Sequence, residues 1–214
     1  MAIETSPTRA ERSWVVPASA VVFAVLFILG MLLSGMSSDT QDKTVDEILK
    51  DFDDNKVAAV IAAYVLVVAA LAFLPLAWAM TRKVEASLSA MALQVARWTA
   101  VLFAATLMIG GILFAALAGA VEFGGEDAPP VEFIRYIPQI GYGIILIAGA
   151  LTVAVFLVIV SRAGQTGGAL AQWFCILGYV AAVAMLVGVL FIPMLLLPIW
   201  AIAAAFQLKG PALA

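Results

Sequence analysis

Long apolar segments alternate with short polar ones along most of the chain. The first apolar segment, 14–34, has about the ~20 residues that a helix needs to cross a bilayer. The polar segment that follows, 37–56, holds the densest cluster of acidic residues in the sequence, and a second polar segment covers 121–138. This pattern predicts an all-α fold in the form of a polytopic transmembrane bundle.

Six helices are expected to cross the membrane within one transmembrane domain, 14–209, between tails at 1–13 and 210–214. The predicted spans are about 14–34, 57–80, 94–120, 140–160, 169–192 and 194–208. The last two come from a single apolar run, 170–208, which is too long for one crossing of a ~30 Å hydrocarbon layer. A turn near Ile192 and Pro193 would divide it, and one span plus a re-entrant segment is the alternative.

The first polar segment contains a helix start. Thr44 and Glu47 have the spacing of a capping box, in which the side chain of each residue accepts a hydrogen bond from the backbone N–H of the other. The apolar residues that follow recur on one helical face: Val45, Ile48, Leu49 and Phe52. We predict a short amphipathic outer helix over 44–54, ended by acids at the unfavourable end of its dipole and docked as a cap on the bundle.

Two other local features affect the backbone. In the second polar segment, the pairs Gly124-Gly125 and Pro129-Pro130 predict an irregular loop. Pro75 falls near the end of the second span, where it removes one backbone hydrogen bond and predicts a kink.

The composition agrees with a membrane protein and excludes several kinds of site. The chain is 65% hydrophobic and 12% charged, against roughly 45–50% apolar residues in soluble domains. Its 11 basic residues form no cluster, so no nucleic-acid partner is expected. A single cysteine, Cys175, and the lack of histidine argue against an internal disulfide, a zinc site or a histidine-ligated haem. We therefore expect no cofactor.

The distribution of basic residues predicts the orientation, because cytoplasmic loops carry an excess of lysine and arginine. With alternating crossings, one side receives seven basic residues: Arg9, Arg12, Arg82, Lys83, Arg97, Arg162 and Lys209. The other side receives four: Lys43, Lys50, Lys56 and Arg135. Both termini are therefore expected in the cytoplasm of a bacterial plasma-membrane protein, with both acidic polar segments outside.

The outer segments hold the only concentrated polar chemistry, which makes them a candidate surface for an envelope protein partner. Its candidate residues are Asp46, Glu47, Asp51, Asp53, Asp54 and Arg135. Arg135 is expected to pair with one of the acids at 46, 47 or 51. The acids from 51 onward resemble the start of a calcium loop, but Lys56 replaces the required glycine and Ala62 the final bidentate acid, so no metal site is predicted.

Apart from Arg97, which is close enough to the interface to reach it, the predicted spans lack charged side chains, so neither catalysis nor ion-coupled transport is expected. Tyr64, Tyr142 and Tyr179 could line an interhelical pocket for a neutral or lipid-like molecule. Small residues repeat every four positions from Gly111 to Gly119 and from Gly178 to Ala182. Such faces favour close helix packing, within the chain or in a homo-oligomer.

The order of parts also resembles a known group. An acidic amphipathic segment directly after the first span, TVDEILKDFDDNK, and a closing Leu-Pro-Ile-Trp in an apolar last hairpin are similar to uncharacterised integral membrane proteins of actinobacteria. The resemblance implies six helices and a plasma-membrane location, and it supplies no catalytic residues.

Two functions follow as hypotheses. The first is a non-enzymatic interaction or accessory protein that presents its acidic outer cap to a partner. The alternative is a carrier or binder of a neutral or lipid-like small molecule.

Overall fold

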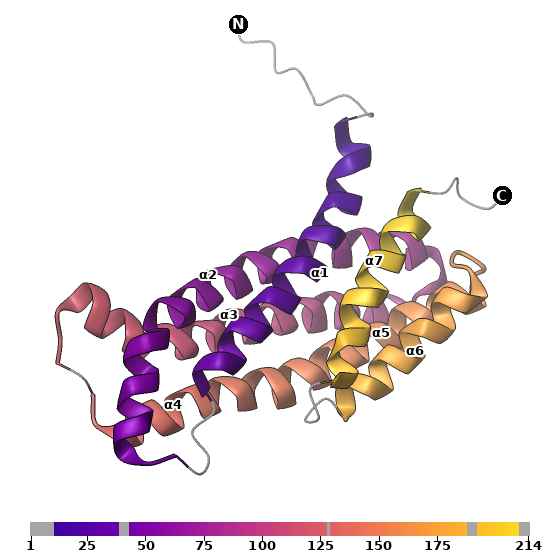
Figure 1. Ribbon diagram of the computed structural model, residues 1–214. Helices are drawn as coiled ribbons and strands as arrows, with labels where there is room; N and C mark the ends of the chain where they lie inside the picture. Colours follow the sequence, from indigo (N-terminus) through magenta and orange to yellow (C-terminus); the bar gives the residue numbers. More distant parts are fainter. Residues whose placement is uncertain (1–10, 39–42, 128, 188–191, 210–214) are drawn as a thin grey trace, which may run out of the picture.

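The computed structural model describes residues 11–38, 43–127, 129–187 and 192–209, and all regular structure in them is helical (Figure 1). The α-helices are α1 (Glu11–Ser38), α2 (Val45–Val84), α3 (Ala90–Gly124), α4 (Val131–Gly143), α5 (Ala150–Thr166), α6 (Gln172–Leu186) and α7 (Leu196–Lys209). Short 3₁₀ segments are η1 (Glu85–Ser87) and η4 (Ile192–Leu195), and η2 (Ile144–Gly149) is a π-helix. The predicted all-α fold is confirmed.

Among the described residues, four helices are long and apolar enough to cross a membrane: Trp14–Ser34, Val45–Ser87, Ala90–Gly124 and Val131–Thr166. The last of these joins α4, η2 and α5 into one helical body. Their most apolar stretches have mean hydropathies of 2.4 to 2.9. The first four predicted spans therefore correspond to long helices, each extended by polar turns beyond the apolar stretch.

The C-terminal run was predicted to hold two full spans; its described part contains two shorter helices, and residues 188–191, at the predicted end of the fifth span, lie outside the described residues. α6 has 15 residues and α7 has 14, or about 22 Å and 21 Å of helix, and both are shorter than the ~20 residues of a crossing. They form a hairpin that reaches only part of the length of α2 and α3 (Figure 1). α7 begins after Pro193, which lies in η4.

Gln207 holds both ends of this hairpin at the same end of the bundle. Its side-chain oxygen accepts from the Ala171 amide at 3.1 Å, just before α6. Its backbone carbonyl accepts from the Lys83 ammonium, in the last turn of α2. The C-terminus of α7 therefore lies beside the start of α6 and the end of α2.

The outer helix is not a separate element. The predicted start at Thr44 is confirmed, but α2 continues from Val45 to Val84 without a break, so the expected end near residue 54 is wrong. Figure 1 shows the first turns of α2 at an angle to the rest of the helix. The Asn55 side chain donates to the Asp51 carbonyl at 2.9 Å, a contact of the kind that bends helices.

The second polar segment is also more helical than predicted. α3 ends at Gly124, and Gly125 adopts a left-handed conformation, with φ 68°, that caps it. α4 then begins at Val131 and contains Pro138, so the irregular residues of the described chain are limited here to 125–127 and 129–130. The π-helix follows Pro138 within the same helical body.

A row of aromatic rings runs through the centre of the bundle. Phe73 of α2 lies 5.1 Å from Phe23, 4.8 Å from Phe103 and 5.7 Å from Phe156, measured between ring centroids. Phe156 in turn lies 6.0 Å from Trp200 of α7. All five rings are buried, so one core joins α1, α2, α3, α5 and α7.

Glycines allow three pairs of helices to approach closely: α3 with α4, α2 with α3, and α5 with α6. A Cβ added at Gly141 would lie 2.9 Å from the Gly110 carbonyl, and one at Gly111 would lie 3.1 Å from the Leu66 Cβ. A Cβ at Gly178 would collide with the Ser161 hydroxyl. Gly111 and Gly178, predicted from their small-residue spacing, thus serve packing within the chain.

The bundle has two chemically different ends. We call the end where α1 stops, α2 starts, α3 stops and α4 starts the acidic end. The opposite end is the basic end, where α2 stops, α3 starts and α5 stops, and it carries Arg82, Lys83, Arg97 and Arg162. Exposed tryptophans lie in the turns nearest to the basic end: Trp14, Trp78, Trp98 and Trp173.

Candidate functional site

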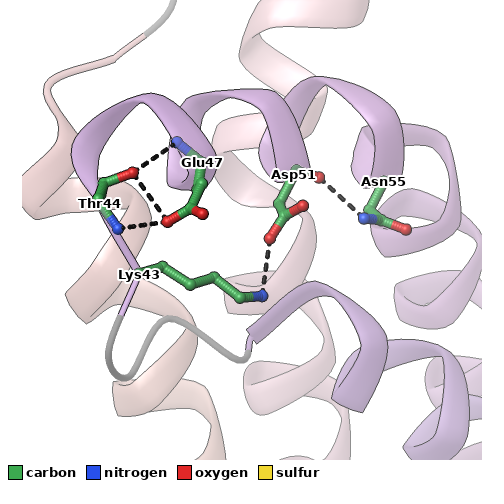
Figure 2. A network of polar contacts seen from close by, with 5 residues as sticks. All are labelled: Lys43, Thr44, Glu47, Asp51 and Asn55. Carbon is green, nitrogen blue, oxygen red and sulfur yellow. Dashed lines mark hydrogen bonds and ion pairs between the residues drawn. The ribbon is translucent and has the colours of Figure 1, made fainter.

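The acidic end is built on the first turns of α2. The Thr44 amide and hydroxyl both donate to the Glu47 carboxylate at 2.8 Å, and the Glu47 amide donates to the Thr44 hydroxyl at 3.4 Å (Figure 2). This is the predicted capping box, and it orders the segment from its first residue. The hydrogen bond from the Thr44 amide holds the pKa of Glu47 below its ordinary value.

The predicted apolar stripe is turned inward for most of its length. Ile48 is 1% exposed, whereas Val45, at the very start of the helix, is 53% exposed. Leu49 and Phe52 are half-buried, and Phe52 lies beside Ile134 of α4 and Phe114 of α3 around a small cavity of about 20 Å³. The segment 45–56 is therefore docked on α3 and α4 while remaining part of α2.

Asp51 and Asp53, two acids of the predicted partner surface, are in ion pairs. Lys43 pairs with Asp51 at 2.7 Å (Figure 2). Lys56 pairs with Asp53 at 2.8 Å and with Glu122, in the last turns of α3, at 3.3 Å. The Asp53 carboxylate, followed by Glu122, raises the pKa of the Lys56 ammonium. Lys56 thus connects the outer part of α2 to α3.

The predicted role of Arg135 is not found. Glu47 is bound to Thr44 and Asp51 to Lys43, and no ion pair among the described residues joins Arg135 to an acid. Its Nε is buried and lacks a hydrogen-bond partner. The connection between the two polar segments is made by Lys56 and Glu122. Glu122 is 66 residues away in the sequence, so helical spacing gave no indication of the pair.

Two of the predicted surface acids remain open to solvent. Asp46 and Asp54 are exposed, and neither takes part in an ion pair or a side-chain hydrogen bond within the described residues. They lie eight residues apart, about two helical turns, with the exposed Lys50 between them on the same side. The open part of the predicted surface is therefore a short row with charges in the order minus, plus, minus.

The three tyrosines do not share a pocket. Tyr64 is 70% exposed on the outer side of α2. The Tyr142 hydroxyl donates to the Ser34 hydroxyl at 3.2 Å, and its ring packs 4.6 Å from that of Phe114. The Tyr179 hydroxyl of α6 donates to the Gln165 side chain of α5 at 3.4 Å. The predicted common pocket is not formed.

Hydroxyls inside the bundle are mostly used by their own helices. Thr99, Thr106 and Thr152 each donate to a carbonyl three or four residues earlier. The Ser161 hydroxyl and the Trp200 indole nitrogen are buried without partners, and both lie next to Gly178. In the part of the chain that the structure describes, no group of three or more metal-ligating side chains is found.

Comparisons with protein-family models, with curated proteins and with solved structures gave no match for this chain. The resemblance to actinobacterial membrane proteins thus stays a prediction.

Proposed function

We propose that this chain is an integral membrane protein that works by contact, without catalysis, and presents the row Asp46, Lys50 and Asp54 to a basic segment of an envelope protein. The supporting observation is that these side chains stay exposed on a backbone fixed by the capping box, the buried Ile48 and the Lys56 ion pairs. A fixed backbone lowers the ordering cost of binding.

The proposal includes a location and an orientation. The four long apolar helices would cross a bacterial plasma membrane, with the basic end and both termini in the cytoplasm. The exposed tryptophans near the basic end support the location of this end at a membrane interface, because tryptophan is enriched at both interfaces; the orientation rests on the basic residues. The acidic end would then face outward.

Site-specific photo-crosslinking in intact cells tests the partner. A crosslinking side chain at position 54 should give a discrete product with a protein, while one at Met91, which is 79% exposed at the basic end, should not give that product. Because the contact is between exposed charges, the product should decrease in high salt and in an Asp46→Asn background. A product of equal yield in all backgrounds, or the same product from position 91, would contradict a charge-based contact at the acidic end.

A further inference from the structure

The hypothesis of a lipid-like ligand finds support at the basic end, in a hollow that none of the three tyrosines lines. Two open hollows lie between α2 and α3. One, of about 430 Å³, lies toward the acidic end and includes Tyr64 and Phe123 in its walls. The other, of about 240 Å³, lies toward the basic end and includes Trp78 and Arg97.

The two hollows open on the same side of the bundle. Val60 and Val67 line the first hollow, and Leu74 and Thr81 line the second. These four residues follow one another at steps of seven, about two turns of helix, so they lie on one face of α2. Trp78 and Val101, at the walls of the basic-end hollow, are 49% and 45% exposed. That hollow is therefore reached from the outer surface of the bundle.

The basic-end hollow combines apolar walls with one cation. Apart from Arg97 and Thr81, its lining is apolar, and the Thr81 hydroxyl already donates to the Trp78 carbonyl at 2.9 Å. The Arg97 guanidinium carbon lies 4.6 Å from the centre of the Trp78 ring, a cation–π contact that fixes the side chain at the hollow. An apolar hollow with a fixed cation at its edge matches an amphiphile with an anionic head.

Arg97 lacks a full set of acceptors. Its nearest acid is Glu85, with a nitrogen-to-oxygen distance of 3.6 Å, which is longer than a hydrogen bond. Its Nε is buried and has no hydrogen-bond partner. A guanidinium presents donors in a planar fork that fits phosphate oxygens. An anionic oxygen at this edge would supply acceptors that the protein does not.

The neighbouring charges favour an anion. Arg82 is exposed and lies one turn beyond Trp78 on the same face of α2. Lys83 is next to it and donates to the Gln207 carbonyl. Glu85 is the one acid found against Arg97 among the described ion pairs. Lys83 is bound to α7, so two basic side chains, Arg97 and Arg82, stand against one acid and leave the mouth of the hollow positive.

We propose that the hollow formed by Leu74, Ala77, Trp78, Arg97, Ala100 and Val101 binds an anionic phospholipid, with one acyl chain in the hollow and the phosphate at Arg97 and Arg82. This inference rests on the membrane insertion proposed above but not on the partner at the acidic end. The ligand's source is the leaflet next to the basic end.

Native mass spectrometry in detergent tests the site with phosphatidylglycerol as the probe and phosphatidylcholine as the neutral lipid. The wild-type chain should retain phosphatidylglycerol in preference to phosphatidylcholine. Arg97→Gln should weaken phosphatidylglycerol retention about tenfold, because it removes a charge-assisted contact. Val101→Trp, which fills the hollow from its exposed rim, should weaken retention of both lipids.

Arg162→Gln is the matched control, since Arg162 is an exposed arginine of the basic end that borders another hollow, of about 210 Å³, between α3 and α5. It should retain phosphatidylglycerol as the wild type does. Equal retention by the wild type and Arg97→Gln, or equal losses in Arg97→Gln and Arg162→Gln, would overturn the proposal. If Arg97→Gln does not fold, lipid retention by Arg97→Lys and by Val101→Trp is compared with that of the wild type instead.

A photoactivatable phosphatidylglycerol carrying its reactive group on the acyl chain gives a second readout on the unmodified chain. Labelled peptides should map to α2 and α3 around Trp78 and Val101. Labelling that is spread over all lipid-facing helices would overturn the site. Recovery of the chain in the membrane fraction tests insertion separately, so failure of the lipid site and failure of the membrane proposal give different results.

Discussion

Single glycines decide how closely the long helices can approach. At Gly141 the obstacle to a larger residue is the Gly110 backbone carbonyl, 2.9 Å from an added Cβ, and backbone cannot move aside as the end of a side chain can. At Gly119, by contrast, an added Cβ would meet nothing within 4 Å. The same residue type thus has opposite sensitivity at two positions of the bundle.

We expect Gly141→Ala to lower the free energy of unfolding by about 1–3 kcal/mol, the usual cost of overpacking a core. Gly119→Ala, the matched control, should be neutral or slightly stabilising, because alanine favours helix more than glycine does. Thermal unfolding in detergent, followed by circular dichroism, measures both. Equal midpoints for the two variants would show that α3 and α4 do not meet at Gly110 and Gly141.

A second prediction at this scale concerns the apolar contact of the outer part of α2. Ile48→Asp places a charge where the native side chain is 1% exposed, so we expect a loss of at least about 2 kcal/mol. For a chain of this size that lowers the thermal midpoint by about 4–8 °C. Val45→Asp, three residues earlier and 53% exposed, is the control and should change the midpoint little. An unchanged midpoint in Ile48→Asp would mean that the segment is not docked.

At the scale of elements, Lys56 is the group that joins two helices at the acidic end. It bridges Asp53 of its own helix and Glu122 of α3, while Lys50 on the same segment is exposed and has no ion pair within the described residues. Individual exposed ion pairs contribute little to global stability. The consequence of losing Lys56 should therefore be local.

We expect Lys56→Met to increase amide hydrogen exchange over 45–56 without changing exchange in the rest of α2. Lys50→Met should leave exchange over the same residues as in the wild type. Hydrogen exchange followed by mass spectrometry compares the two variants. If both increase exchange equally, the effect comes from charge removal in general and not from the connection to α3.

Elements with strong local signals were predictable from the sequence. The helix start at Thr44 was predicted because the capping box is a contact between residues three positions apart. The loop at 125–130 was likewise marked by Gly125 and Pro130. The four long helices follow from the lengths of their apolar runs.

Other features depend on competing local effects or on contacts between residues far apart in the sequence, and the sequence did not predict them. The end of the outer helix was placed near 54 because acids there oppose the helix dipole, but that effect is only about 0.3–1 kcal/mol per charge. No glycine or proline interrupts residues 45–74, so the helix continues. The prediction of a common tyrosine pocket was wrong because the length of a span does not determine how its helix is rotated about its own axis, and this rotation decides which side chains face a neighbour.

On the scale of the whole molecule, the structure separates two regions that have different chemistry. The acidic end holds ordered, exposed charges, and the basic end holds exposed tryptophans, arginines and an apolar hollow lined by Trp78 and Arg97. The short α6–α7 hairpin starts and finishes at the basic end, since Gln207 contacts both Ala171 and Lys83. The end of α7 therefore lies at the basic end whether or not the hairpin crosses the membrane.

The orientation of the bundle is the claim on which the partner surface depends. It is tested most directly by cysteine labelling on a Cys175→Ala background, with Asp54→Cys at the acidic end and Met91→Cys at the basic end; both side chains are exposed. In intact cells an impermeant maleimide should react with the cysteine at 54, and with that at 91 only after the membrane is permeabilised. Reaction at 91 but not at 54 before permeabilisation would contradict this orientation and place the acidic end in the cytoplasm.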